Sequence, residues 1–309
     1  MKTYYRLMLG KGSKFAAECF EGGWIGAGFG IKQDLANDLP EAWREFNAKF
    51  IPVVLAANPG KTKIGAGLAC GALWTVCKGI KIGDVVLSPD GTGRYRVGEV
   101  TGAYYYEAGH VLPHRRAIHW TDTYIERESM SEALRNSTGS IGTVCDISRF
   151  VDEIGRLGEG RRPPPPPLLE GEAIEDVAAF AMEKHLEDFL VANWAQTELG
   201  RDYDIYVEDD ELVGQQYQTD TGSIDILAIS KDRRRLLVVE LKKGRPSDAV
   251  VGQILRYMGF VNDELCEFGQ TVVGAIIALD DSQKIRRALS LVPSISFYRY
   301  QVSFKLVRG

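Results

Sequence analysis

The alternation of apolar and polar positions in the second half of the chain predicts strands set between helices. An amphipathic helix is expected over residues 174–194, and another, capped by Ser247, should run to about Phe260. Strands are predicted at 212–218, 223–230, 236–242, 271–279 and 297–306. The run 271–279 is almost continuously apolar, as in a central strand that is covered on both faces. This half is therefore expected to form an α/β domain.

The first half shows shorter β-type runs mixed with helical patterns. Residues 39–55 and 66–78 have the spacing of helices. The runs 84–87 and 95–100 are separated by a Pro-Asp-Gly turn signal at 89–91, which predicts a hairpin. The pattern suggests a small α+β domain that is built on a curved sheet or barrel.

A proline run separates the two halves. Pro163–Pro167 are five consecutive prolines, which cannot join a helix or the middle of a sheet and favour an extended spacer. Glycine-rich residues 155–160 precede them. We therefore predict a domain at 1–150, a Gly/Pro-rich linker at 151–172 and a second domain at 173–309.

Composition narrows the class of protein. Hydrophobic residues make up 45% and charged residues 26% of the chain, a balance typical of globular proteins rather than disordered ones. The sequence contains no apolar run long enough to cross a membrane and no signal peptide, so we expect a cytoplasmic protein without membrane contact. Five scattered cysteines, none in a CxxC pair, favour free thiols over disulfides or zinc: Cys19, Cys70, Cys77, Cys145 and Cys266.

Charge is distributed unevenly between the halves. The net charge is −5, which argues against a protein that coats nucleic acid but does not exclude a nuclease. Residues 1–150 hold 18 Lys and Arg against 15 Asp and Glu, whereas residues 151–309 hold 19 against 27. The acidic half is the better candidate for a metal site, and the basic half is the better candidate for contacts with phosphate.

One set of polar residues falls at the ends of predicted strands. Asp225 lies in the strand 223–230, and Glu240 and Lys242 end the next strand. Residues two apart on a strand project from one face, so Glu240 and Lys242 should lie together while Leu241 points into the core. Gln253 lies on the helix that follows. The alternative is that these residues form surface ion pairs that contribute little to stability and have no catalytic role.

These residue types suit phosphodiester cleavage. Two carboxylates and a backbone carbonyl, here from Asp225, Glu240 and Leu241, can hold Mg²⁺ or Mn²⁺ and leave water ligands in place. Such a metal activates water and neutralises developing charge. Lys242 can position the water or steady the phosphate, and Gln253 can hydrogen-bond to the lysine, the water or a phosphate oxygen.

Residues 222–260, GSIDILAISKDRRRLLVVELKKGRPSDAVVGQILRYMGF, resemble the core of PD-(D/E)xK nucleases, closest to the NucS-type and Mrr-like restriction-enzyme branch. The resemblance covers about 173–309 and implies a restriction-endonuclease-like domain with a central mixed sheet flanked by helices. It assigns catalytic roles to Asp225, Glu240, Lys242 and Gln253. The family also takes a glutamate from the preceding helix. Glu183 is preferred here, and Glu187 is the alternative.

The first half carries no comparable catalytic set. His110, His114 and His119 raise the question of a metal, but no cysteine or second motif completes a ligand set. The sequence His114-Arg115-Arg116 more simply predicts a basic segment that reaches phosphate. Ordinary surface charge is the alternative.

Residues 81–120 resemble PUA-like or EVE-like modules, which are small barrels that read modified or flipped bases. The resemblance implies that aromatic residues of this half stack a base, with core packing as the alternative for each. The candidates are Trp24, Trp74, Tyr104, Tyr105, Tyr106 and Trp120.

Together these features predict a DNA endonuclease whose first domain selects the target and whose second domain cuts it. The resemblance implies a prokaryotic restriction or phage-defence role, with modified phage DNA as one candidate target. The alternatives are a NucS-like mismatch or repair endonuclease and a DNA-binding sensor without catalysis. Cutting both strands with one site per chain would favour a homodimer.

Overall fold

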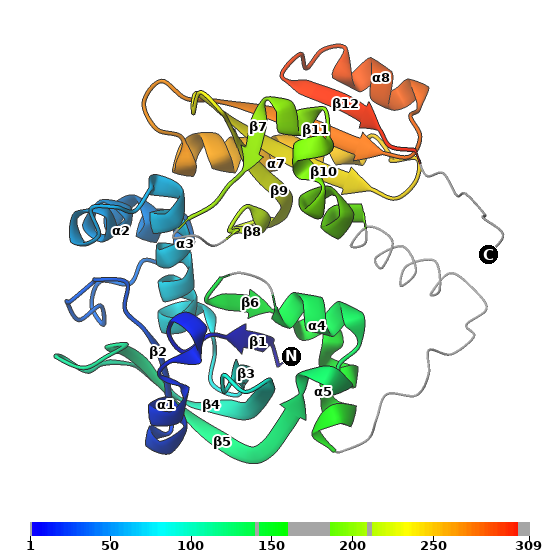
Figure 1. Cartoon of the computed structure of the whole chain (residues 1–309). Helices are drawn as coiled ribbons and strands as arrows, with labels where there is room; N and C mark the ends of the chain where they lie inside the picture. The colour runs from blue at the N-terminus through cyan, green and yellow to red at the C-terminus, as the bar shows by residue number, and fades with distance from the viewer. Residues whose placement is uncertain (1, 140–141, 160–185, 209–211, 302–309) are drawn as a thin grey trace. The chain divides into compact units, whose positions relative to one another are not determined.

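The computed structural model describes residues 2–139, 142–159, 186–208 and 212–301. The chain divides into two compact units, unit 1 at residues 1–168 and unit 2 at 169–309 (Figure 1). No helix within the described ranges has the length and apolar character needed to cross a membrane. Both units combine a mixed sheet with helices, which confirms the predicted α/β (α+β) class.

Unit 1 is built on a six-stranded sheet in the order β2-β5-β4-β3-β1-β6. Its strands are β1 (Tyr4–Leu7), β2 (Trp24–Ala27), β3 (Val85–Pro89), β4 (Arg94–Tyr106), β5 (His114–Glu126) and β6 (Val144–Asp146). Only β1 and β3 pair in parallel among these neighbours. The pairing of the long β4 and β5 shifts register twice, and such irregularities bend and twist a sheet. The predicted curved sheet is therefore present.

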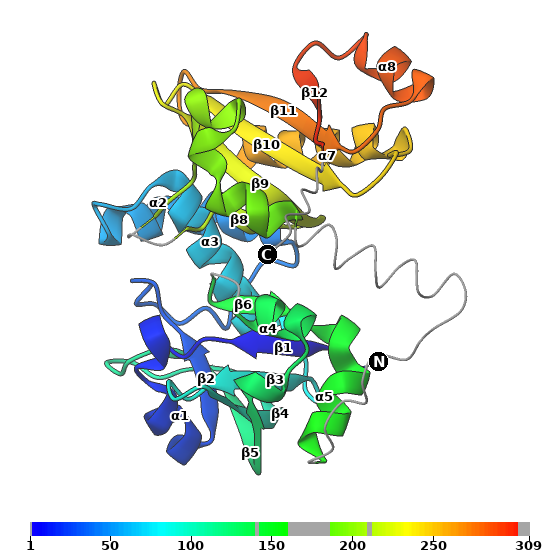
Figure 2. The ribbon, with the colours of Figure 1, turned by 45° about the vertical axis from the view of Figure 1, so that its right-hand side comes forward.

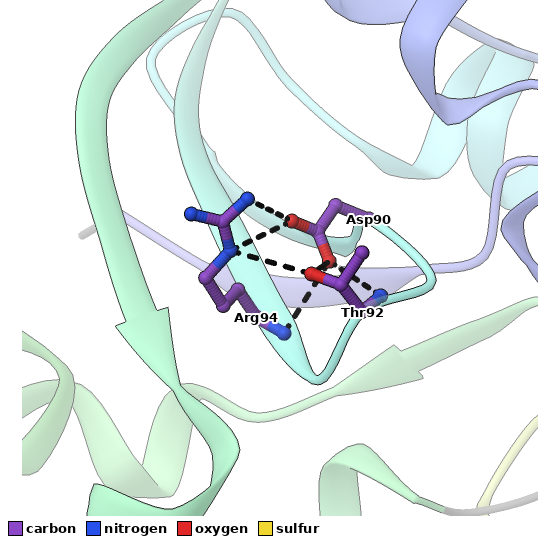
Figure 3. Close-up of polar contacts among 3 residues, drawn as sticks. All are labelled: Asp90, Thr92 and Arg94. Atoms are coloured by element: carbon purple, nitrogen blue, oxygen red, sulfur yellow. Dashed lines mark hydrogen bonds and ion pairs between the residues drawn. The ribbon is translucent and has the colours of Figure 1, made fainter.

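The Pro-Asp-Gly signal forms the predicted β3–β4 hairpin turn (Figure 3). The Asp90 Oδ1 atom accepts hydrogen bonds from the backbone N and the hydroxyl of Thr92, each at 2.8 Å. The Nε of Arg94 donates to Asp90 Oδ2 at 3.0 Å, which ties the second strand back to the turn. Gly91 adopts a φ of 86°, which only glycine tolerates without strain.

The helices of unit 1 are α1 (Ala16–Gly22), α2 (Trp43–Ala57), α3 (Lys63–Trp74), α4 (Glu132–Thr138) and α5 (Val151–Gly158). Helix α2 begins later than the predicted 39–55 because side chains near α3 bind the backbone just before it. Trp74 Nε1 donates to the Pro40 carbonyl, and Lys78 Nζ donates to the Leu39 carbonyl. Helix α3 begins earlier than predicted because Thr62 caps it by accepting from Gly65 N.

Helix α5 corrects the start of the predicted linker. Residues 151–158 are helical, and Ile154 and Leu157 pack into a hydrophobic cluster with Leu87 and Ile125 of the sheet. Glycine at 155 and 158 does not prevent this helix because its two buried apolar residues, Ile154 and Leu157, lie one turn apart and are buried together. The proline run itself lies outside the described residues.

The contact between α2 and α3 gives a test of packing in unit 1. A Cβ atom on Gly71 would lie 2.3 Å from Cζ2 of Trp43, a distance that real contacts never reach. We expect Gly71→Ala to lower the free energy of unfolding by about 1–3 kcal/mol through overpacking. Gly155 has nothing within 4 Å of its would-be Cβ, so the control Gly155→Ala should instead stabilise the protein by about 0.5–1 kcal/mol. Chemical denaturation of both variants measures the difference; equal effects would contradict this packing.

Unit 2 contains the sheet β12-β11-β10-β9-β7, and β8 also pairs with β9. The strands are β7 (Tyr203–Ile205), β8 (Gln215–Thr219), β9 (Gly222–Ser230), β10 (Arg235–Lys242), β11 (Thr271–Ala278) and β12 (Ile295–Arg299). Strands β10, β11 and β12 run parallel, whereas the pairs of β9 are antiparallel. Five of these strands overlap the predicted runs, whereas β7 was not predicted from the sequence.

Helix α7 (Ala249–Phe260) packs on the sheet of unit 2 near β10 and β11 (Figure 2). Gly274 of β11 allows close contact with Ile254 and Met258 of this helix. Asp248 rather than Ser247 is its N-cap, and no side chain caps it, so the predicted cap is wrong. Helix α8 (Gln283–Leu289) lies between β11 and β12 in sequence. Residues 186–192 are helical, and the rest of the predicted helix 174–194 lies mainly outside the described residues.

Candidate active site

The antiparallel pairing of β9 and β10 brings the two predicted strand carboxylates together. The register pairs Ile226 with Val239, so Asp225 and Glu240 are the next residues on adjoining strands. The backbone N of Leu241 donates to Asp225 Oδ2 at 2.8 Å, which binds the Asp225 side chain directly to the end of β10. The hairpin therefore places both carboxylates at one edge of the sheet.

Lys242 and Glu240 share a face of β10, as their spacing predicts. Lys242 Nζ lies 2.8 Å from Glu240 Oε1, with the lysine partly exposed and Glu240 only 1% exposed. Leu241, between them, packs in the core on the other face with Trp194 and Ile277. The alternation of the strand thus gives the site a buried carboxylate with a cation that reaches toward solvent.

The carboxylates around Asp225 are electrostatically crowded. Burial raises the pKa of Asp225 well above its usual range, and the nearby charges of Glu240 and Glu187 raise it further. The hydrogen bond from Leu241 N opposes this shift. Acids that repel one another in a desolvated place gain most from a bound cation.

The side chain of Gln216 bridges Glu187 and Asp225 by hydrogen bonds. Its buried carboxylate accepts a hydrogen bond from Gln215 Nε2 at 2.7 Å and another from Gln216 Nε2. The same Gln216 amide donates to Asp225 Oδ1 at 3.2 Å. Glu187, the alternative helix glutamate, therefore lies at the site, whereas the preferred Glu183 lies outside the described residues.

Gln216 was not predicted from the sequence as a site residue. Its φ is 52°, a left-handed conformation that costs a non-glycine residue energy and recurs at functional sites. The available signal was the polarity of β8, where Gln215, Gln216 and Gln218 occupy a strand of the sheet. Partly buried amides in a sheet need partners, and here two of them find carboxylates.

Gln253 faces a second residue that sequence reasoning missed. Its Nε2 lies 3.4 Å from the hydroxyl of Tyr257, one helical turn later on α7. Burial raises the pKa of Tyr257; the hydrogen bond from Gln253 lowers it, and the charges of Glu240 and Asp225 raise it. Tyr257 is thus close enough to both acids to feel their charge. The spacing of Gln253 and Tyr257 on one helix face was the signal that could have found it.

The bridging role of Gln216 can be tested by replacing its amide nitrogen, the hydrogen-bond donor, with a carboxylate oxygen. Gln216→Glu would place a third carboxylate against Glu187 and Asp225. We expect it to lower the free energy of unfolding by about 2–3 kcal/mol at neutral pH, because a buried charge then lacks a partner. The amide of Gln218 instead contacts Ser223 Oγ and a backbone carbonyl, so Gln218→Glu is the matched control with a smaller effect. Denaturation curves for both variants compare them, and equal losses would contradict the bridge.

The donor atoms at this site are carboxylate and carbonyl oxygens, which suit Mg²⁺ or Mn²⁺ better than zinc. Over the described ranges, no group of three or more His, Cys, Asp and Glu side chains is arranged to hold a metal ion. The predicted ligand set needs only Asp225 and Glu240 with the Leu241 carbonyl. These oxygen donors fit a hard cation that keeps several waters, and Glu187 is the further carboxylate that lies near them among the described residues.

The basic segment of unit 1 differs from its prediction. Arg115 and Arg116 are only 6% and 5% exposed. Arg116 donates to the carbonyls of Gly102 and Ile80, at 2.8 and 2.6 Å. Arg115 donates to two loop carbonyls and covers the ring of Trp24 at 3.6 Å. The expectation that these arginines reach phosphate is corrected, because their buried guanidinium groups donate to backbone carbonyls instead.

His114 also has a structural environment. It is fully buried, and burial lowers its pKa, which favours the neutral ring. Its Nε2 lies 2.9 Å from the Ile31 carbonyl, and its Nδ1 lies 3.0 Å from the hydroxyl of Tyr104. Because a carbonyl can only accept, Nε2 carries the hydrogen and Nδ1 accepts from Tyr104. His114 and Tyr104 thus connect β4 and β5 to the loop at Ile31, and the fully buried His114 is not placed to contact phosphate.

The tryptophans of unit 1 follow the core-packing alternative. Trp24 and Trp120 are buried, and Trp120 Nε1 donates to the Cys19 carbonyl at 3.0 Å. Trp74 is partly buried and donates to Pro40 as described above. Tyr105 and Tyr106 keep part of their surface exposed. These two tyrosines remain candidates for stacking a base.

Comparisons with known proteins add the following. Residues 5–148 match the model of a domain of unknown function, DUF8426. No curated protein matches the sequence. A complex of EndoMS with dsDNA resembles the chain with a TM-score of 0.33 and 13% identity, over 72% of this chain and 66% of that one. A repair endonuclease from Pyrococcus abyssi gives 0.31 and 14%, over 69% and 66%. EndoMS in apo form gives 0.28 and 18%, over 39% and 45%.

The chain thus spans just under two thirds of the length of two of these solved structures and less than half of the third. Similarity at these TM-scores does not align individual residues. The functional assignment therefore depends on the residues of the site in unit 2.

Proposed function

We propose that the protein is a Mg²⁺- or Mn²⁺-dependent DNA endonuclease with its active site in unit 2. The observation that carries the proposal is the meeting of Asp225, Glu240 and Lys242 at one edge of the sheet, with Glu187 joined to them by Gln216. Surface ion pairs, the bland alternative, do not bury a carboxylate as deeply as Glu240 or crowd three acids together.

Asp225, Glu240 and the Leu241 carbonyl would hold the cation, with Glu187 or Glu183 supplying a further oxygen. When bound, the cation lowers the pKa of a water and offsets the charge that develops on the phosphate. Lys242 orients the attacking water or donates to a phosphate oxygen, a role suited to a partly exposed ammonium beside Glu240. Tyr257 of α7 lies within electrostatic reach of Glu240 and Asp225, and Gln253, which donates to its hydroxyl, would orient a hydrogen-bonded water with it.

We further propose that the biological role is restriction or defence against phage, with unit 1 selecting the target DNA. Tyr105 and Tyr106 are the aromatic residues in unit 1 that this selection would use. A mismatch or repair endonuclease is the alternative, and the two roles differ in the DNA that is preferred.

The test is a cleavage assay with the full chain. Supercoiled plasmid and defined duplexes (unmodified, base-modified and mismatched) are incubated with Mg²⁺, Mn²⁺ or EDTA. Cleavage with either metal and none in EDTA supports the proposal, and the preferred duplex separates defence from repair. Direct conversion of plasmid to the linear form would support a homodimer, whereas nicking would not. Binding without cleavage in both metals would favour the non-catalytic sensor.

A further inference from the structure

Three exposed arginines of unit 2 lie near the ends of the parallel strands. Arg245 follows β10, Arg286 lies on α8 and Arg299 ends β12. The side chains of Arg245 and Arg286 are 65% and 70% exposed, and Arg299 is exposed too. We call these three residues the edge arginines. Their concentration contrasts with the acidic character of the second half of the chain.

The topology places the edge arginines beside the candidate active site. Because β10, β11 and β12 are parallel, their carboxyl ends meet at one edge of the sheet. The register aligns Lys242 with Ala278, and Ala278 with Arg299. Residues in one such row project from the same face. Arg299 therefore shares a face with Lys242, two strands or roughly 10 Å away.

Two aspartates pair with two of the edge arginines. Arg245 Nη2 lies 3.4 Å from Asp280 Oδ2, and Arg286 Nε donates to Asp281 Oδ2 at 2.7 Å. The hydrogen bond from Arg286 lowers the pKa of Asp281, and the charges of Arg286, Arg299 and Arg245 lower it further. All three guanidinium groups thus lie within electrostatic reach of one carboxylate. Exposed ion pairs of this kind are weak and can be exchanged for another anion.

We propose that the edge arginines bind backbone phosphates of the DNA strand that is cut, adjacent to the phosphate held at Lys242. This inference rests on the proposed function. Guanidinium groups bind phosphate oxygens in a bidentate manner, and they retain their charge at every relevant pH. The two aspartates keep Arg245 and Arg286 at the sheet edge in the absence of DNA and release them to the phosphates when DNA binds.

The test measures DNA binding by the full chain as a function of salt. A defined duplex is titrated in EDTA, so that no cleavage occurs, at about 50 to 300 mM KCl. If each arginine contacts one phosphate, Arg245→Gln, Arg286→Gln and Arg299→Gln combined should reduce the slope of log affinity against log salt by about 2–3. At physiological salt the affinity should fall roughly 100-fold. Arg299→Gln alone should reduce the slope by about 1.

A charge-matched control lies at the opposite end of β10. Lys231, Arg233 and Arg234 belong to the turn that joins β9 and β10, and all three are exposed. Their combined change to Gln alters the net charge by the same amount but should leave the slope nearly unchanged. Equal slopes for the two triple variants would overturn the proposal, because binding would then follow net charge rather than this surface.

Asp281→Asn tests the same surface through an expected increase in DNA affinity. It removes the negative charge that pairs with Arg286 and that also acts on Arg299, so DNA affinity should rise several-fold at low salt. Unchanged or weaker binding, with unchanged thermal unfolding, would contradict the exchange of aspartate for phosphate. Failure of the edge-arginine proposal can be distinguished from failure of the proposed nuclease function. Wild-type cleavage with an unaffected salt slope in the triple variant rejects only the edge arginines, whereas absence of wild-type cleavage rejects the nuclease.

Discussion

Asp225→Asn and Glu240→Gln should each reduce the rate of Mg²⁺-dependent DNA cleavage by about 10³-fold. Each change removes one anionic oxygen from the cation site while leaving the side chain nearly the same size. Loss of several kcal/mol of transition-state stabilisation corresponds to this factor, at about 1.4 kcal/mol for each tenfold. Single-turnover rates at saturating protein measure the chemical step, and DNA affinity in EDTA shows whether binding survives.

Lys242→Gln should lower the same rate, and its neighbour provides the control. Strand alternation predicts that Lys243 points away from Glu240, so Lys243→Gln removes the same charge from a residue outside the proposed active site. We expect the Lys243 variant to cleave within a few-fold of wild type. Near-normal cleavage by the Asp225, Glu240 or Lys242 variants, with thermal unfolding unchanged, would remove these residues from the active site.

Arg116→Met should lower the free energy of unfolding of unit 1 by about 3 kcal/mol. The substitution retains an apolar chain of similar length but leaves the carbonyls of Gly102 and Ile80 without the donors that now satisfy them. A buried unsatisfied polar group costs about 1–3 kcal/mol. Chemical denaturation measures the loss. Arg156 is exposed on α5, so Arg156→Met should change stability by about 0.5 kcal/mol or less.

Arg116→Met also distinguishes a phosphate-binding role from a structural role for the basic segment His114-Arg115-Arg116. A phosphate contact would leave stability intact and reduce the salt slope of DNA binding by about 1. The buried geometry predicts the reverse for Arg116: lower stability and an unchanged slope for the folded protein. A stable Arg116→Met protein with a reduced slope would restore the original expectation for this segment.

The core of the candidate site could be predicted because it is local. Asp225, Glu240 and Lys242 lie on two strands joined by a short turn, and period-two alternation decides which side chains share a face. The apolar runs on these strands also identified β9, β10 and β11 to within about one residue. The polar turn at the β3–β4 hairpin was predictable for the same reason, since its shape depends on neighbouring residues.

The remaining site residues come from contacts between distant segments. Gln216 joins Glu187 to Asp225 only after a helix, β8 and β9 have come together, and no local pattern specifies which amide meets which acid. The row from Lys242 to Arg299 likewise depends on the order and register of three parallel strands. Parallel register is decided by packing of the intervening helices and loops, whose effect is spread over many residues.

In unit 1, the sequence alone did not show which polar side chains are buried. The sequence His114-Arg115-Arg116 does not indicate whether these side chains face solvent or the core. Their charge and polarity do not reveal which backbone carbonyls lie nearby. Strand alternation would have predicted that Arg115 and Arg116 point to opposite faces, but not that both are buried. Residues on both sides of β5 cover them: Trp24 and the loop before β5 bind Arg115, whereas Ile80 and Gly102 bind Arg116. Burial is a property of the surrounding fold, so the chemistry of these arginines was decided by tertiary packing, whereas that of the Asp225–Lys242 hairpin was already present in its local pattern.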